Sequence, residues 1–289
     1  MDTKKGETLK ISCILAVKNF GAREVLTIRN IQRSFGEIEI IVVTPDKVSS
    51  SKSKELGIQI HRDNGSGIHS AYNIGASNAK GDYIFFAGSG DVYDYRAGKV
   101  VSMTIESFPG NQIYGFGSVW AHWKKMTIQK GYAREDSIWN SGVLVSGLPV
   151  SHQTMFYDRK KFLAAGFLDE TLRTSSDYKH LTECFLKGYR MLVTKKKIAI
   201  VDNSGISSKQ GNLVLEEHVS IVNENLGLNS LNLANQVLRA GKGWLNLDPG
   251  LVIPKEVNQM IDQARDTNSK IRNSNSVVIL LFGYAIILG

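Results

Sequence analysis

The stretch over residues 61–91 constrains the fold most, because it carries a glycine-rich turn, a helical pattern, an apolar run and a carboxylate in succession. Apolar residues at i, i+3 and i+4 spacing over 68–76 predict a helix, which Gly81 should end. The aromatic and apolar run 83–87 predicts a buried central strand. Asp91 follows that strand by four residues. The carboxyl end of a central strand is where open α/β sheets bind their ligands.

Strand and helix patterns alternate along the first third of the chain. Apolar runs at 11–17, 38–43 and 57–61 predict three strands ahead of the one at 83–87. Amphipathic spacing over 24–31 and a polar segment over 49–55 predict the helices between them. This alternation predicts an α/β fold with a mostly parallel sheet flanked by helices.

The remainder of the chain is less regular. Its patterns predict strands over 154–157 and 198–201, and helices over 98–108, 159–166, from Ser175, over 219–238 and over 256–265. The segment 120–139, rich in tryptophan and lysine, fits either a β excursion or a mobile lid, and its periodicity does not decide between them. We predict an α/β domain over residues 1–215 and a C-terminal helical extension over 216–289.

The charge of the chain points to an anionic partner. Its formal net charge is +8 and its pI is about 9.3, which favours acidic substrates or a membrane surface. Lysines and arginines are scattered, with short clusters only at 159–161 and 195–197, and neither cluster has the pattern of a nucleic-acid motif. We therefore expect no nucleic-acid partner.

Two features favour a cytoplasmic location. Cys13 falls in an expected strand and Cys184 in an expected helix, so we predict two buried free thiols, which suit a reducing compartment. The polar N-terminus is not followed by an apolar signal segment, so export is not indicated.

The end of the chain, 277–289, is apolar and uncharged. It is shorter than the roughly 20 residues of a membrane span, which leaves a peripheral membrane contact or a buried terminal helix.

The glycine-rich turn is a weak match to a dinucleotide-binding fingerprint. Gly65 and Gly67 have the right spacing, but Ser70 replaces the third glycine and the turn follows the third strand rather than the first. An oxidoreductase is therefore a distant alternative.

Two carboxylates are candidates for chemistry. Asp91 is either an ordinary turn residue or the ligand of Mg²⁺ or Mn²⁺, with a substrate diphosphate completing the coordination. Asp177 is either a helix cap or a general base that takes a proton from an attacking hydroxyl. His152 and Gln153, just before an expected strand, fit a phosphate or sugar contact, and a structural histidine fits equally well.

Several motifs occur in a characteristic order. The first strand ends in Val17-x-Asn19, and the motifs that follow are G-I-x-x-A-x-N-x-G at 67–75, A-x-G-D-Y-I-F-F at 79–86, S-G-D at 89–91, Y-G at 114–115, H-Q-x-x-F-Y at 152–157, G-F-L-D-E at 166–170 and D-Y at 177–178. In this order the chain resembles family 2 glycosyltransferases, in particular the exopolysaccharide type that includes the colanic acid transferases. The resemblance covers roughly residues 9–218.

The resemblance implies a GT-A fold and transfer of a sugar, with inversion, from a nucleoside-diphosphate sugar such as a UDP-sugar to a polysaccharide or lipid-linked glycan. It implies that Asp91 holds Mg²⁺ or Mn²⁺ and that Asp177 is the base. The donor-binding positions that it suggests are Ala16, Val17, Asn19, Asp46, Asp63, Gly67, Asn73, Ser89, His152 and Gln153. The Q-x-x-R-W signature of processive synthases is absent, so we expect addition of one sugar.

The chain departs from the family pattern on the nucleotide side. Thr44 stands where the family has a carboxylate after the second strand, with Asp46 as the nearest substitute. Gly65 and Ser70 replace two further carboxylates, and Asp63 is close to the first of them. These differences keep open a second interpretation, that of a non-catalytic member that binds a nucleotide or a glycan.

Overall fold

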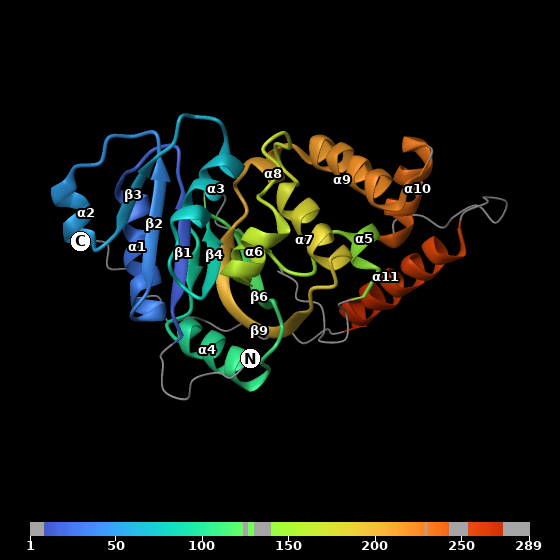
Figure 1. Ribbon diagram of the computed structural model, residues 1–289, viewed down its shortest axis with the longest axis horizontal. Coiled ribbons are helices and arrows are strands. Elements are labelled where there is room, and N and C mark those ends of the chain that lie inside the picture. Colours follow the sequence, from blue (N-terminus) through green and yellow to red (C-terminus); the bar gives the residue numbers. More distant parts are fainter. Residues whose placement is uncertain (1–8, 124–126, 130–139, 229, 243–253, 274–289) are drawn as a thin grey trace.

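The computed structural model describes residues 9–123, 127–129, 140–228, 230–242 and 254–273 (Figure 1). The strands of these residues form one nine-stranded sheet in the order β3-β2-β1-β4-β8-β6-β9-β5, with β7 paired to β6 outside this path. The strands are β1 (Ile11–Ala16), β2 (Glu39–Thr44), β3 (Gln59–Arg62), β4 (Tyr83–Ala87), β5 (Val92–Tyr93), β6 (Ile113–His122), β7 (Thr127–Gln129), β8 (Met155–Asp158) and β9 (Met191–Asp202).

Helices cover both faces of this sheet. They are α1 (Ala22–Phe35), α2 (Ser50–Leu56), α3 (Ile68–Asn78), α4 (Ala97–Ser107), α5 (Val143–Ser146), the 3₁₀ turn η2 (His152–Thr154), α6 (Arg159–Ala165), α7 (Ser176–Leu186), α8 (Ile206–Lys209), α9 (Gly211–Leu226), α10 (Leu231–Gly241) and α11 (Lys255–Asn273).

The first half of the sheet follows the sequence patterns closely. Strands β1, β2, β3 and β4 pair in parallel, and the helices between them lie where amphipathic spacing predicts. Helix α3 packs against β1 so closely that a Cβ on Gly75 would lie 2.3 Å from the side chain of Ile14. Glycine is therefore required where this helix crosses the sheet.

The second half of the sheet is mixed. Strand β8 runs antiparallel to both β4 and β6, whereas β6 and β9 run parallel to each other. As a result β9 and β6 end at the same edge of the sheet as β4, and β8 begins there. Trp120 of β6 pairs with Gln129 of β7 in an antiparallel ladder, so the described part of 120–139 is a β excursion. Residues 124–126 and 130–139 of this segment lie outside the described residues.

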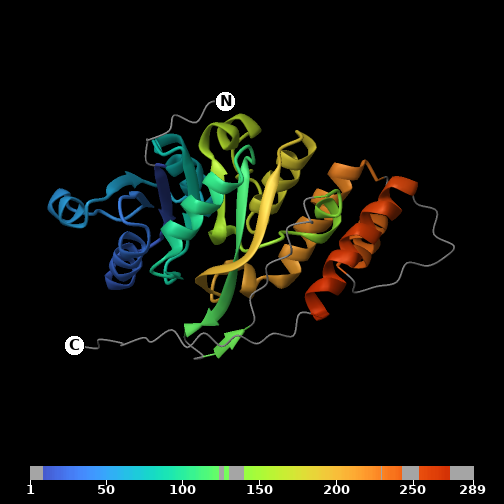
Figure 2. The same cartoon turned by 90° about the horizontal axis from the view of Figure 1, so that it is seen from below.

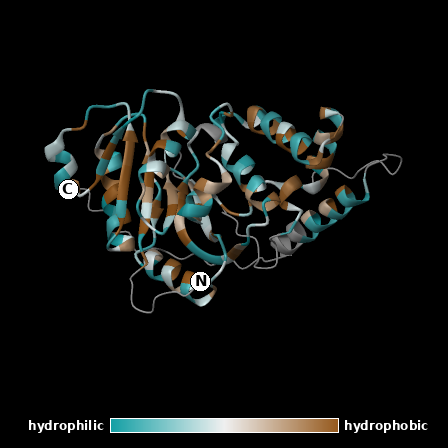
Figure 3. Cartoon of the chain, viewed as in Figure 1, coloured by the Kyte–Doolittle hydropathy of each residue, from teal (hydrophilic) through white to brown (hydrophobic). Residues whose placement is uncertain are grey.

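Apolar side chains form a core on each face of the sheet. One core joins α1 and α4 to the sheet through residues such as Ile28 and Val101. The other joins α3, α6, α7, α9 and α10, and includes Tyr72 and Leu181. Figure 3 shows the apolar residues concentrated along the strands. Cys13 and Cys184 are buried and free, one in each core, which confirms the two predicted thiols.

The helices of the C-terminal region pack beyond α7, at the end of the molecule opposite α2 (Figures 1 and 2). The prediction of one helix over 219–238 is wrong. Gly227 adopts a left-handed conformation with φ 58° and ends α9, and α10 starts again at Leu231. The strand expected over 198–201 is also longer, since β9 begins at Met191. Among the described helices, none has the length and apolar character needed to cross a membrane, and the tail 277–289 lies outside the described residues.

Candidate functional site

The turn between β4 and β5 fixes Asp91. Its Oδ2 accepts the N–H of Gly88 at 2.7 Å, and its Oδ1 accepts the N–H of Asp202, at the end of β9, at 2.9 Å. The residue is 2% exposed. Burial raises the pKa of Asp91 to about 7; the two N–H groups oppose this rise and the charge of Asp202 adds to it. Asp91 therefore sits where a proton or a cation is favoured.

A second carboxylate lies beside it. Asp202 forms an ion pair with the guanidinium of Arg23 from α1 and accepts the hydroxyl of Ser204 at 2.6 Å. Its side chain is 6% exposed, whereas that of Arg23 is 46% exposed. Two acidic groups and one accessible cationic group thus meet at the carboxyl edge of the sheet.

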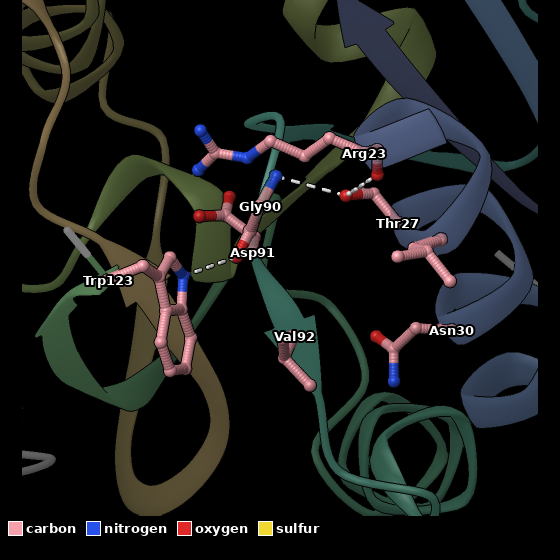
Figure 4. A pocket seen from close by; sticks show the side chains of 8 residues that line it. Arg23, Thr27, Asn30, Gly90, Asp91, Val92 and Trp123 are labelled. Carbon is pink, nitrogen blue, oxygen red and sulfur yellow. Dashed lines mark hydrogen bonds between the residues drawn. The ribbon is translucent and has the colours of Figure 1, made fainter. Parts of the chain in front are cut away.

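A cavity of about 470 Å³ opens between α1 and the β4–β5 turn (Figure 4). Trp123 closes one side and donates its indole N–H to the carbonyl of Gly90 at 2.9 Å. On the other side, Thr27 accepts the N–H of Gly90 at 3.0 Å. The lining residues are Arg23, Leu26, Thr27, Asn30, Gly90, Asp91, Val92 and Trp123.

A wider groove of about 950 Å³ lies next to this cavity, between α1 and the loop after β2. Asp46 lines it and accepts the N–H of Phe20 at 2.7 Å. Lys47 and Lys52 also line it, and Leu26 is shared with the cavity. The groove therefore offers cationic groups and apolar surface next to Asp91.

Asp177 lies in the first turn of α7. Its Oδ1 accepts the N–H of Tyr178 at 2.8 Å, and its Oδ2 lies 4.0 Å from Nδ1 of His152. The side chain keeps 21% of its surface exposed. Burial raises the pKa of Asp177, the neighbouring His69 lowers it, and the charge of Glu217 raises it. A carboxylate with a raised pKa and some exposure is suited to accept a proton.

His152 is a buried, neutral neighbour of Asp177. Its ring stacks on Phe86 with centroids 4.8 Å apart, and its Nε2 finds no hydrogen-bond partner among the described residues. Burial lowers the pKa of His152 to about 3, and His69 and His180 lower it further. The imidazole is therefore uncharged at neutral pH, and Asp177 has no ion-pair partner in it.

Tyr72 of α3 connects the surroundings of the two carboxylates. Burial raises the pKa of its hydroxyl, and the charges of Asp91 and Asp177 raise it further. Its ring also contacts His152 edge-on, with centroids 6.0 Å apart. Both carboxylates thus lie within electrostatic reach of one tyrosine.

Most of the other predicted binding residues lie at the same edge. Ala16, Val17 and Asn19 follow or end β1, Asp46 follows β2, and Asp63 and Gly67 stand between β3 and α3. Ser89 lies in the Asp91 turn and donates to Glu24. His152 and Gln153 form η2 at the start of β8, and the carbonyl of Gln153 accepts the hydroxyl of Tyr93.

Asn73 has a different setting. Its amide donates to the carbonyl of Leu168 at 2.8 Å and to Glu170, and accepts the N–H of Leu168 at 2.9 Å. Its side chain thus joins α3 to the loop ahead of α7. Its predicted contact with the donor stays a prediction.

The chemistry of the donor set is compatible with a divalent cation. Within the described residues, no group of three or more His, Cys, Asp or Glu side chains forms a metal cluster. Asp91 and Asp202 are carboxylates in mutual electrostatic contact, and each oxygen of Asp91 accepts one backbone N–H. Mg²⁺ and Mn²⁺ accept oxygen ligands of this kind when substrate phosphates and water supply the rest.

Sequence reasoning missed three residues of this region. Asp202 is the last residue of the buried strand β9, much as Asp91 follows the buried strand β4. A carboxylate at the end of an apolar run was therefore a signal that could have identified Asp202. Arg23 and Glu217 lie on helices among many charged residues, and nothing in their spacing separates them from solvated positions.

Comparisons with known proteins show the fold. No protein-family model matches the chain, and no curated protein sequence matches it. The chain is similar to the solved structure of S. aureus TarS, at 12% identity and a TM-score of 0.58, over 91% of this chain and 54% of that one. It thus spans about half the length of the TarS chain.

Two further structures extend this likeness. TarS 1–349 in complex with UDP-GlcNAc matches at 13% identity and a TM-score of 0.58, over 91% of this chain and 89% of that one. The mannosyltransferase PcManGT from Pyrobaculum calidifontis, in complex with GDP-Man and Mn²⁺, matches at 9% identity and a TM-score of 0.57, over 94% and 77%. The expected α/β fold of the GT-A type, a curled sheet flanked by helices, is confirmed.

Proposed function

We propose that the chain is an inverting glycosyltransferase of the family 2 type that moves one sugar from a nucleoside-diphosphate sugar, such as a UDP-sugar, to a polysaccharide or lipid-linked glycan. One observation carries the proposal: two carboxylates, the buried Asp91 and the partly exposed Asp177, lie within electrostatic reach of Tyr72 at the edge of the sheet where ligands bind. The likeness to folds solved with UDP-GlcNAc and GDP-Man supports the class of donor.

Asp177 acts as the base in this proposal. Its carboxylate takes the proton of the acceptor hydroxyl while the hydroxyl oxygen bonds to the anomeric carbon of the donor sugar. The bond from that carbon to the diphosphate breaks on the opposite face, and a nucleoside diphosphate leaves. Two features support this role. The raised pKa of Asp177 makes its carboxylate a stronger base, and His152, which is neutral, does not form an ion pair with that carboxylate.

Asp91 and Asp202 would hold a divalent cation, which would neutralise charge on the departing diphosphate. Arg23 adds a positive charge of this chain at the same place, since its guanidinium is accessible beside Asp202. Lys47 and Lys52 in the neighbouring groove suit the phosphate and nucleoside part of the donor. Membrane contact through residues 277–289, and a cytoplasmic location, are part of the proposal on sequence grounds.

The test is a donor screen with purified protein, Mn²⁺ and the common nucleotide sugars, measuring release of nucleoside diphosphate and sugar transfer. Asp91→Ala and Asp177→Asn should each lose transfer. Asp82→Asn is the matched control, because Asp82 lies at the opposite end of β4 and accepts the N–H of Lys10. Unchanged turnover in both site variants removes the mechanism.

A second candidate function is a non-catalytic protein of the same fold that binds a nucleotide or a glycan. Thr44, Gly65 and Ser70 favour it. The glycosyltransferase family that the chain resembles has carboxylates at these positions. Calorimetry with Mn²⁺ and a panel of nucleotides separates the two functions. Tight binding of a nucleotide, without turnover of any nucleotide sugar, favours the second.

The membrane contact has its own test. Full-length protein should sediment with anionic liposomes, and a chain ending at Ser276 should not. Equal sedimentation of the two proteins contradicts the contact.

A further inference from the structure

The loop over residues 166–175 leads into α7 and so places Asp177, in the first turn of that helix, at the site. The loop also carries backbone N–H groups that need hydrogen-bond acceptors. It starts at Gly166, where α6 ends, and finishes at Ser175, the N-cap of α7. The hydroxyl of Ser175 caps no backbone N–H in the described first turn of α7. Buried N–H groups without a partner are costly, so this loop must find acceptors elsewhere in the molecule.

Glu217, on α9, supplies those acceptors. Its Oε1 accepts the N–H of Arg173 at 2.7 Å. Its Oε2 accepts the N–H groups of Thr174 and Ser175, both at 2.9 Å, and the hydroxyl of Thr174 at 2.6 Å. One carboxylate thus binds three consecutive residues at the position immediately before α7.

Glu217 is ionised in this setting. It is 8% exposed, and burial alone would raise its pKa, but the hydrogen bonds from Thr174 and Arg173 outweigh burial and leave the pKa below its ordinary value. Charge-assisted hydrogen bonds are about twice as strong as neutral ones. Each hydrogen bond between the Glu217 carboxylate and the loop is therefore stronger than a bond to a neutral acceptor.

Helix α3 holds the same loop from its other side. Asn73 exchanges two hydrogen bonds with the backbone of Leu168, and Nδ1 of His69 lies 2.8 Å from the carbonyl of Leu172. These contacts lie in the earlier part of the loop. Within the part of the chain that the structure describes, Glu217 is the side chain that accepts the backbone N–H groups of residues 173–175.

We propose that Glu217 is the positioning residue for Asp177: from the helical extension, its carboxylate fixes residues 173–175 and so sets where the first turn of α7 presents the Asp177 side chain. The inference rests on the proposed function of Asp177. It gives α9 (Gly211–Leu226) a part in the site, although Glu217 itself lies beyond residue 215, the predicted end of the α/β domain. Glu217 also acts through its charge, which reaches Asp177.

The variant that tests this is Glu217→Gln, which keeps the shape of the side chain and removes its charge and one acceptor oxygen. Glu216→Gln is the matched control, because Glu216 is the exposed neighbour on the same helix. We expect Glu217→Gln to lower kcat by about tenfold or more, with the KM for the donor unchanged, because the bonds around Asp91 are untouched. The acid limb of its kcat against pH profile should move to lower pH, since a negative charge near Asp177 is lost.

A merely structural role would reduce the amount of folded enzyme and leave the position of that limb unchanged. A kcat and a pH profile equal to those of Glu216→Gln overturn the inference. If Glu217→Gln does not fold, Thr174→Val provides the second test, because it removes one bond to Glu217 and retains the charge. Thr174→Val should lower kcat by a few fold without moving the limb, and an unchanged kcat overturns the inference.

Hydrogen exchange separates this inference from the proposed function. In Glu217→Gln, amides of residues 173–178 should exchange about tenfold faster than in Glu216→Gln, whether or not any donor is turned over. Faster exchange in a protein that transfers no sugar would support the positioning of Asp177 and reject the transferase. Equal exchange would reject the positioning itself.

Discussion

Asp91 and Asp177 are two acidic residues at one edge of the sheet, both with a raised pKa, yet the chain holds them in different ways. Asp91 is held by its own turn and by the end of β9, through backbone N–H groups of Gly88 and Asp202. The position of Asp177 depends on the loop over residues 166–175. Side chains of two helices hold this loop: Asn73 on α3 and Glu217 on α9. The proposed cation side of the site is thus built into the sheet, whereas the proposed base is positioned by helices packed on it, α3 and α9, which with α5, α7 and α10 we call the helical layer.

The largest expected effect separates the two roles. Asp177→Asn should lower kcat by roughly 10²–10⁴-fold, the usual contribution of a general base, with donor affinity unchanged. Asp91→Asn should instead weaken donor binding in the presence of Mn²⁺, because it removes a charged ligand of the proposed cation that would neutralise the diphosphate. Calorimetry with a donor and Mn²⁺, alongside turnover, measures both. Equal losses of donor affinity in the two variants would contradict this division.

The next effect concerns stability against pH. The pKa of Asp91 is raised to about 7 in the folded chain from 3.8, so its contribution to stability is full below pH 3.8 and is lost as the pH rises through 7. Relative to Asp91→Asn, the wild-type protein should lose about 3 kcal/mol of unfolding free energy between pH 5 and pH 8 in the absence of metal.

Denaturant unfolding of both proteins at pH 5 and pH 8 checks this. The quantity to compare is the change in unfolding free energy between the two pH values, because any pH-independent cost of the substitution cancels in that difference. Asp177 titrates in both proteins, so its own raised pKa cancels. If the unfolding free energies of the two proteins change equally with pH, the pKa of Asp91 is not raised by burial in the folded chain.

The two regions also differ in how far sequence could predict them. The turn around Asp91 was predictable, because a buried strand, two glycines and a carboxylate are consecutive and each acts through local backbone chemistry. The surroundings of Asp177 were not. Glu217 is one of many charged residues on a helix, and its partners Thr174 and Ser175 lie 43 and 42 residues earlier in the chain.

The same reasoning explains the errors in the fold. The alternating first half was predicted to within a few residues because each element has its own period. Strand β9 was predicted too short because exposed lysines interrupt its apolar pattern: Phe116 pairs with Thr194 and Gly117 with Lys197, so a bulge carries Lys195 and Lys196 out of register. Gly227 was overlooked as a helix end because the apolar pattern continues on both sides of it.

A substitution in the helical layer should affect Asp177 and spare Asp91. A Cβ on Gly241 of α10 would lie 2.4 Å from the carbonyl oxygen of Val145 in α5. The neighbouring carbonyl, of Leu144, accepts the hydroxyl of Tyr178, the residue after Asp177. Gly241→Ala should therefore cost about 1–3 kcal/mol of stability and lower kcat, with donor affinity unchanged.

Gly211→Ala is its matched control, because a Cβ there meets nothing within 4 Å and the residue begins α9. Thermal unfolding and turnover of the two variants measure the effect. If Gly241→Ala weakens donor binding more than it lowers kcat, the helical layer supports both carboxylates and the comparison fails.

The smallest effect should come from the wall of the Asp91 cavity. Trp123→Phe keeps an aromatic ring beside Gly90 and removes one hydrogen bond, which is worth about 1 kcal/mol for a neutral pair. The turn retains the bond from Gly90 to Thr27 and both backbone bonds to Asp91, so the carboxylate should stay in place. Donor KM should rise less than about tenfold, with kcat unchanged. A loss as large as that of Asp91→Asn would mean that the tryptophan contacts the donor directly. The proposed cation side of the site would then depend on a residue outside the sheet core, as the proposed base does.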